Sequence, residues 1–245
     1  MEPHRLGRAR TLAEQAAEEI RNRIVNGRLR LGEALSETAV AAELGISKTP
    51  VREAFLLLRT EGLVDIQPQR GTFVFRMDAA DARKLSEFRE ALEVAALRLA
   101  IANDTKGLGR RLSAIVGEMG VALADRGNPE YRNLDARFHQ QIIDDADNGY
   151  LSRAYAAVAF RIQALRYRLR ATADLDARSL KHHHRLATLV GRGQRDRAVE
   201  LLREHIRRTL DDYANTLALE QSGELGAPPT RPPRGRRARS RRSRS

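Results

Sequence analysis

The apolar positions divide this chain into an N-terminal part of mixed character and a longer part that is helical throughout. Before residue 77, apolar stripes with helical spacing are followed by two short β-like runs, Leu63–Ile66 and Thr72–Phe75. After residue 77, the apolar residues repeat only with helical spacing, in segments separated by Gly, Asn-Pro and Asp. We therefore expect a mainly α protein with two domains.

A helix-turn-helix pattern lies in the first part. A short helical segment, Glu37–Glu43, leads into Gly45, which supplies a turn conformation that side chains resist. Ser47 is the predicted N-cap of a second helix, and Pro50 falls in its first turn, where a backbone N–H has no intrahelical partner to lose. An earlier helix begins at the capping-box signature Thr11–Glu14 and should pack behind this pair.

The second helix has one apolar face and one polar face. The apolar stripe consists of Val51, Ala54, Phe55 and Leu58. Lys48, Thr49 and Arg52 project from another face near the helix N-terminus, where such side chains can reach guanine edges or phosphates. The two β-like runs flank the turn Gln67–Gly71, which predicts a wing. The alternative is that the basic residues are only the solvent-exposed side of a helix.

Composition favours a folded intracellular protein. The chain has 245 residues and 42% hydrophobic content, which is enough for two apolar cores. It contains no Cys, which excludes disulfides, thiolate zinc sites and Cys nucleophiles. No apolar run approaches the roughly 18 residues of a membrane span, and Met1–Arg10 lacks the apolar core of a signal peptide. We expect a cytoplasmic protein without membrane contact.

The formal charge of +12 is concentrated at the C-terminal end. Residues 222–245 contain eight Arg and one Glu, so this Pro-, Gly-, Ser- and Arg-rich segment carries +7 and predicts a disordered tail. Such a tail either contacts phosphates or is inert. We divide the chain into a flexible arm (1–10), a winged helix-turn-helix domain (11–76), an all-helical bundle domain (77–221) and the tail (222–245). The six helices expected in the bundle are Ala79–Asn103, Leu108–Asp125, Pro129–Ala146, Tyr150–Ala173, Ala177–Arg192 and Arg195–Glu220.

Four residues of the bundle domain have the type and spacing of metal ligands. Asp135 and His139 lie four residues apart, on one face of a helix. In the run His182–His184, the surrounding apolar stripe makes His183 the most inward member, and His205 in the last helix also points toward the core. One carboxylate and three imidazoles suit Zn, Ni, Mn or Fe(II) and leave positions open for water or a small anion. Taken alone, each His is more often a core or surface residue than a ligand.

The segment LSETAVAAELGISKTPVREAF, followed by EGLVDIQPQRGTFV, resembles the winged helix-turn-helix of the GntR superfamily of bacterial transcription regulators. By this resemblance, contacts with double-stranded DNA fall to Ser47, Lys48, Thr49 and Arg52 on the second helix, Thr38 at the DNA backbone, and Arg70 and Gly71 at the wing tip. Lys48 stands where the family commonly has arginine, which weakens the case for a bidentate guanine contact there.

The second part of the chain resembles the FCD ligand-binding domain of the FadR subfamily. The resemblance is carried by LSEFREALEVAALRLAIAN, the Asp-x-x-Phe-His element and HHRLATLVGRGQRDRAVELLREHI. In that domain one Asp and three His bind a divalent metal, which implies this role for Asp135, His139, His183 and His205. The resemblance also implies a pocket for a small organic acid, and Arg89 is a candidate counter-ion for a carboxylate effector. The alternative is a solvent-exposed Arg89 paired with Glu93, four residues later.

Two functions remain open at this point. The first is a ligand-responsive transcription regulator, a homodimer that reads a two-fold-related operator and senses a small carboxylate through a metal-containing helical domain. The second is a DNA-binding protein whose helical domain is a metal-dependent enzyme, since Asp/His sites with open positions also activate water. No assignable general acid or base accompanies the predicted ligands, so we expect a regulator rather than an enzyme.

Overall fold

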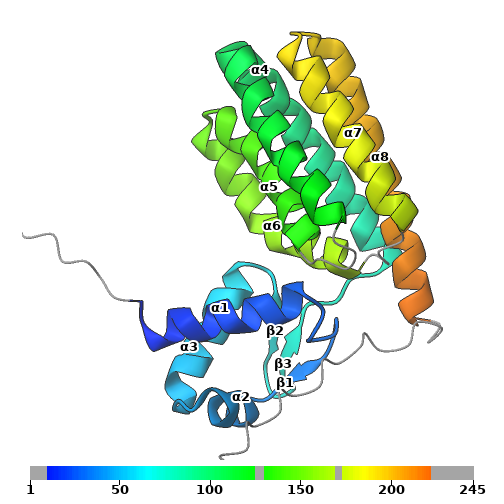
Figure 1. The fold of residues 1–245 in the computed structure, drawn as a ribbon. Helices are drawn as coiled ribbons and strands as arrows, with labels where there is room; N and C mark the ends of the chain where they lie inside the picture. The colour runs from blue at the N-terminus through cyan, green and yellow to red at the C-terminus, as the bar shows by residue number, and fades with distance from the viewer. Residues whose placement is uncertain (1–9, 125–129, 169–172, 222–245) are drawn as a thin grey trace, which may run out of the picture.

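The computed structural model describes residues 10–124, 130–168 and 173–221. A small winged-helix domain lies at one end of an elongated bundle of helices, as the sequence pattern predicted (Figure 1). The predicted Arg-rich tail and residues 1–9 of the predicted arm lie outside the described residues. Within the described ranges, no helix combines the length and apolar character needed to span a membrane.

Three helices form most of the winged-helix domain: α1 (Leu12–Val25), α2 (Glu37–Leu44) and α3 (Lys48–Thr60). The capping box at the start of α1 is present, since the Glu14 N–H donates to Thr11 Oγ1 (3.1 Å) and the Thr11 N–H donates to the Glu14 carboxylate (2.8 Å). The apolar faces of α1 and α3 are buried and pack together. The predicted helix-turn-helix is therefore confirmed.

The turn between α2 and α3 leaves the start of α3 uncapped by a side chain. Gly45 ends α2 in the left-handed conformation, with φ 67° and ψ 31°. Ser47 is the N-cap of α3, but its hydroxyl accepts no capping hydrogen bond. The residue that would donate from the third helical position is Pro50, which has no N–H. The first N–H groups of any helix have no acceptor within the helix, and those of α3 also have no capping acceptor on the Ser47 side chain.

A three-stranded antiparallel sheet completes the domain. Its strands are β1 (Ala34–Leu35), β2 (Val64–Gln67) and β3 (Gly71–Val74), in the order β1-β3-β2. The β2–β3 hairpin is the predicted wing, with bounds one residue away from the predicted runs. Leu63 and Phe75 lie just outside it and close its base, because the Phe75 N–H donates to the Leu63 carbonyl (3.0 Å).

The bundle contains α4 (Ala79–Ala124), α5 (Glu130–Asp145), α6 (Gly149–Arg168), α7 (Ala173–Gly191) and α8 (Arg195–Gln221). The first two predicted helices meet within α4 at Asp104, the one residue of this element outside the helical region, with φ −154° and ψ 77°. The Asp104 carboxylate accepts from the Gly107 N–H (2.8 Å) and so caps the second half of α4. The predicted break between Asn103 and Leu108 is therefore present, but it is confined to a kink at Asp104 rather than a loop.

The two domains share apolar packing. One buried cluster lies among α4 to α8 and is the separate core expected for the bundle. The second cluster is the winged-helix core, but it also contains Ala164 and Leu165 of α6, and Tyr213 and Leu217 of α8. The winged helix thus packs directly on two helices of the bundle, which the sequence pattern did not predict.

A close approach of α4 and α7 allows a test of the bundle packing. A Cβ on Gly109 would lie 2.6 Å from Gly191 Cα, whereas a Cβ on Gly117 of the same helix would meet nothing within 4 Å. Gly109→Ala is expected to lower the free energy of unfolding by about 1–3 kcal/mol, because the obstructing atom is backbone. Gly117→Ala is expected to raise it by about 0.5–1 kcal/mol. Equal urea-unfolding midpoints for the two variants would contradict this packing.

Candidate metal centre

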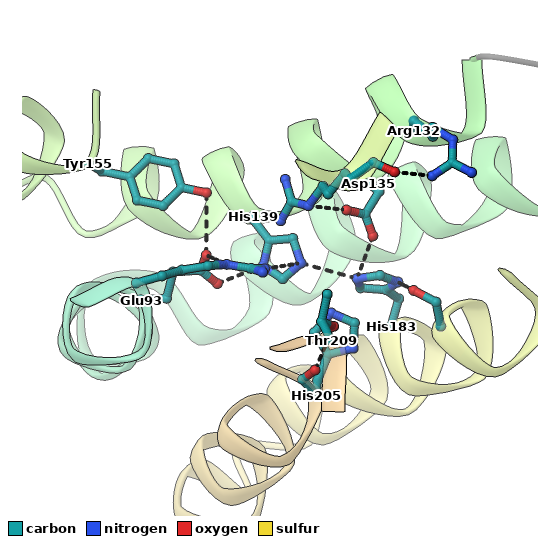
Figure 2. Close-up of polar contacts among 11 residues, drawn as sticks. Glu93, Arg132, Asp135, His139, Tyr155, His183, His205 and Thr209 are labelled. Carbon is teal, nitrogen blue, oxygen red and sulfur yellow. Dashed lines mark hydrogen bonds and ion pairs between the residues drawn. The ribbon is translucent and has the colours of Figure 1, made fainter. Parts of the chain in front are cut away.

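The structure brings the four predicted metal ligands together inside the bundle (Figure 2). Asp135 and His139 project from α5, His183 from α7 and His205 from α8. All four are buried, and one ligand atom from each lies within 4.8 Å of the others. His183 Nε2 is 3.4 Å from His139 Nε2 and 3.4 Å from Asp135 Oδ1. The neighbouring His184 is exposed, whereas His183 is buried, as its more inward position predicted.

His139 is held from both sides of its ring. Its Nδ1 lies 2.6 Å from Glu93 Oε2, and its Nε2 lies 3.0 Å from Arg89 Nη2. A guanidinium only donates, so Nε2 accepts and Nδ1 carries the proton that is donated to Glu93. Glu93 Oε1 also accepts from Arg89 Nε (2.6 Å) and from the Tyr155 hydroxyl (3.3 Å). A carboxylate bonded to the far nitrogen is the arrangement that orients metal-ligating histidines.

Arg166 on α6 holds the Asp135 carboxylate. Its Nε donates to Asp135 Oδ2 at 2.7 Å, and both residues are buried. Burial opposes the ionisation of Asp135, but the positive charge of Arg166 outweighs it, with smaller contributions from His183 and His139 when they are protonated at low pH, and lowers the pKa of Asp135 to about 2. Asp135 is therefore a carboxylate at neutral pH, with Oδ1 near His183.

The three imidazoles are neutral at physiological pH. Burial, which disfavours the charged ring, lowers the pKa of His183 to about 4 and the pKa values of His139 and His205 well below 6.5. The His139 and His205 rings stack with centroids 5.2 Å apart, and the Phe138 ring packs edgewise on His183 at 4.4 Å. A neutral imidazole has the free lone pair that a metal requires.

This donor set fits a divalent transition metal. Two ligand atoms about 2.1 Å from one ion are about 3.0 Å apart at a right angle and about 3.4 Å apart at the tetrahedral angle. The two 3.4 Å separations around His183 Nε2 fall within this range. One carboxylate with three imidazoles suits Zn, Ni, Mn or Fe(II) better than Ca or Mg, which prefer all-oxygen sites.

A cavity of about 60 Å³ adjoins the cluster. Its lining includes Asp135 and His205, together with the two arginines that contact the cluster, Arg89 and Arg166. Arg166 Nη2 is buried and finds no hydrogen-bond partner among the described residues. The wall of the cavity therefore contains two of the predicted metal ligands as well as buried cationic hydrogen-bond donors.

Two neighbours of the cluster, Glu93 and Arg166, escaped the sequence interpretation. Arg89 pairs with Glu93, as the alternative for Arg89 stated, but Arg89 is 1% exposed, so the solvent-exposed position in that alternative is wrong. The role of Arg89 as a counter-ion for an effector stays a prediction. The contacts of Glu93 with His139 and of Arg166 with Asp135 were missed. Both residues sit at positions that continue a buried stripe, four before Leu97 and four after Ile162 respectively. A charged residue on a buried helical face is the signal that could have found them.

The predicted DNA-contacting residues are on the surface of the winged helix. The exposed set comprises Thr38, Ser47, Lys48, Thr49, Arg52, Arg70 and Gly71. Arg52 is already engaged within the chain, because its Nε and Nη2 donate to the Glu37 carboxylate at 3.0 and 2.8 Å. At the wing tip, Gln69 and Gly71 have positive φ values of 61° and 109°, which turn the chain sharply around Arg70. Contacts of these residues with DNA stay predictions.

The low imidazole pKa values can be tested in metal-free protein. In the unfolded chain the histidines protonate near pH 6.5, whereas folded His183 stays neutral down to about pH 4. The unfolded state binds more protons between these values, so the free energy of unfolding should fall as the pH drops through this window. The expected fall is up to about 1.4 kcal/mol per pH unit for each buried imidazole. In denaturant unfolding across this pH window, the free energy of unfolding of His183→Gln should fall less steeply with decreasing pH than that of the wild-type protein. The same pH dependence in both proteins would refute the low pKa of His183.

Comparison with known proteins gives two family matches that together cover most of the chain. Residues 12–74 match the bacterial regulatory proteins of the gntR family, and residues 84–208 match the FCD domain. An HTH-type transcriptional regulator from an unstable DNA locus of Streptomyces ambofaciens, itself uncharacterized, is 32% identical over 79% of this chain and 81% of its own length. The gluconate operon transcriptional repressor of Bacillus subtilis is 28% identical over 69% of this chain and 71% of its own length.

Among solved structures, Escherichia coli McbR/YncC superposes with a TM-score of 0.70 at 19% identity. The superposition covers 87% of this chain and all of McbR/YncC, so the fold extends across both domains. The two family matches and the 32% identity to the Streptomyces relative show that the chain belongs to the GntR family of bacterial transcription regulators and carries an FCD domain.

Proposed function

We propose that this regulator binds its operator through the winged helix and that a small carboxylate, held beside a divalent metal in the FCD domain, controls that binding. The observation that carries the proposal is the buried cluster of one carboxylate and three neutral imidazoles beside a cavity whose lining includes the buried Arg89 and Arg166. A carboxylate effector is also consistent with a relative named as the repressor of a gluconate operon, since gluconate is a hydroxy acid.

The charges of the site favour an anionic effector. The carboxylates of Glu93 and Asp135 offset the guanidinium groups of Arg89 and Arg166, and the imidazoles are neutral. A divalent ion would therefore leave these four buried groups with an excess of two positive charges, and an excess of one remains when Arg132, Asp176 and Asp212, which also line the cavity, are counted as charged. Buried charge is costly unless it is paired, so an anion stabilises the loaded site.

Arg89 provides the first anion-binding donor. Its Nη2 now donates to His139 Nε2, the nitrogen whose lone pair faces the other ligands. Once His139 commits this lone pair to a metal, Arg89 Nη2 loses its acceptor but stays in the wall of the cavity. The metal supplies an electrophile with open positions for a carboxylate oxygen. Arg89 then donates to the same acid, so metal loading and acid binding reinforce each other.

Arg166 provides a second donor. Its Nε is engaged by Asp135, whereas its Nη2 has no partner among the described residues although the side chain is only 5% exposed. An unsatisfied buried donor costs about 1–3 kcal/mol, and an effector oxygen that reaches it recovers that energy. The sequence-based assignment of the effector site to Arg89 alone is therefore extended to two arginines from α4 and α6.

The winged helix offers the features needed to hold DNA. The uncapped N-terminus of α3 presents free N–H groups beside the hydroxyls of Ser47 and Thr49, which is a favourable site for a phosphate. Lys48 and Arg52 are exposed on the first two turns of the same helix. A homodimer fits this use, because two winged helices related by two-fold symmetry can read half-sites about 34 Å apart.

Replacement of Arg52 tests the proposed reading surface. Arg52→Ala is expected to weaken binding to a DNA sequence selected by the wild-type protein by roughly tenfold or more, without changing the fold. Arg98→Ala is a matched control, since Arg98 is an exposed arginine of α4 in the other domain. Fluorescence anisotropy titrations would measure both affinities, and an equal loss in the two variants would point to a general charge effect rather than a specific contact.

Replacement of the metal ligands tests the control by the effector. His139→Ala and His205→Ala are each expected to lower metal affinity by more than about tenfold. Both should still bind the operator but no longer respond to an acid that shifts wild-type binding, because coupling needs a ligand that distinguishes two states. His184→Ala should behave as wild type, since His184 is exposed. Metal analysis and operator titrations decide the matter, and a retained response in His205→Ala would refute the proposal.

A further inference from the structure

The C-terminal end of α6 contacts the element that carries the DNA-reading residues. Arg161 Nε donates to the Gly62 carbonyl at 2.6 Å, and its guanidinium lies 5.5 Å from the centre of the Phe75 ring. Gly62 joins α3 to the wing, and Phe75 follows the last wing strand. A Cβ on Gly62 would come within 2.7 Å of the Arg161 guanidinium, so the contact is tight. Arg161 therefore links the end of the recognition helix to the base of the wing.

Three neighbours of Arg161 on the same helix also contact the winged helix. Arg168 Nη2 donates to the Leu29 carbonyl at 2.9 Å, in the connection between α1 and β1. Between the two arginines, Ala164 and Leu165 are buried in the winged-helix core. One face of the segment Arg161–Arg168 is thus fixed to the DNA-binding domain by apolar packing and by two hydrogen bonds to backbone.

The same segment is fixed to the candidate metal centre by Arg166. Arg166 Nε donates to the predicted ligand Asp135 at 2.7 Å, and the Arg166 carbonyl accepts from Arg132 Nη1 of α5. Leu165 and Arg166 are adjacent residues, yet one packs in the winged-helix core and the other binds a predicted metal ligand. Arg166, which binds the predicted ligand, and Arg161, which binds Gly62, are therefore only about 1.4 turns apart along α6.

We propose that the α6 segment Arg161–Arg168 is a relay, which transmits displacements of the metal centre to the winged helix. Arg166 receives the displacement and is the input of the relay, and Arg161 and Arg168 pass it to the winged helix and are its outputs. The relay rests on the function proposed above. A shift of Asp135 on ligand binding moves Arg166, because a buried ion pair in a close-packed interior is not released at small cost. Arg161 and Arg168 then displace the α3–wing junction and the α1–β1 connection, which sets the orientation of the recognition helix.

Zinc alone serves as the probe, and amide hydrogen exchange in the full chain serves as the readout. Zinc at about 100 times its dissociation constant slows exchange by up to about 100-fold wherever opening requires loss of the metal. In the wild-type protein this slowing is expected in residues 135–143 and 183–206, which contain the predicted ligands. If α6 is the relay, residues 58–75 of the winged helix should also be slowed, by about tenfold or more.

The double variant Arg161→Gln, Arg168→Gln removes both outputs without touching the predicted ligands. It is expected to bind zinc within about twofold of the wild-type affinity and to keep the slowing in residues 135–143 and 183–206. The slowing in residues 58–75 should be lost. Arg153→Gln is the matched control, because Arg153 is an exposed arginine of α6 that packs on Tyr150 at 4.7 Å. This control should behave as wild type throughout.

The outcomes separate the relay from the function on which it rests. If zinc slows no amide near the predicted ligands in the wild-type protein, the metal site itself is refuted, and the proposed function with it. If zinc slows those amides but not residues 58–75, the site stands and the relay is refuted. If the double variant keeps the slowing in residues 58–75, the coupling travels through α8 or α1, and the role of the two arginines is refuted.

Discussion

The geometry of the candidate metal centre depends on two arginine–carboxylate pairs that lie in the apolar interior of the bundle. Arg89 pairs with Glu93 along α4, and Arg166 of α6 pairs with Asp135 of α5. Such pairs gain little over apolar packing, so they are weak evidence of stability for its own sake. Here each pair also touches a predicted metal ligand, since Glu93 orients His139 and Arg166 orients Asp135. We therefore attribute these buried charges to the preorganisation of the candidate metal centre rather than to the stability of the bundle.

The local parts of the fold could be predicted because they depend on short-range rules. The spacing of Val51, Ala54, Phe55 and Leu58 identified the buried face of α3, and all four are buried. Periodicity placed Asp135 and His139 on one helical face and turned His183 and His205 toward the core, and the resemblance to the FCD domain implied that the four act together. The structure brings them together. Helical period alone left each histidine open as a core or surface residue, and the resemblance selected the set.

The parts that could not be predicted depend on contacts between distant segments. The pairing of β1 with β3 joins residues almost forty positions apart, and β1 has only two residues, too few for a recognisable pattern. The pair of Arg166 with Asp135 joins two helices, so the spacing within α6 can indicate that Arg166 is buried but cannot identify its partner. The packing of Leu165 and Tyr213 in the winged-helix core escaped for another reason. An apolar residue on a helix predicts burial, but it does not name the domain that buries it.

Two arginine–carboxylate pairs differ in a way that suits the proposed sensing in one domain and DNA binding in the other. Arg52 and Glu37 form an exposed pair among the predicted DNA-contacting residues, where water can replace either partner and DNA could take over Arg52 at little cost. Arg166 and Asp135 form a buried pair, in which losing one partner typically costs about 3–5 kcal/mol. A coupling of about 1–3 kcal/mol is smaller than that cost, so the buried pair can transmit it without breaking. The exposed pair therefore suits a position where Arg52 exchanges Glu37 for DNA. The buried pair suits a position from which a displacement of Asp135 is passed to α6.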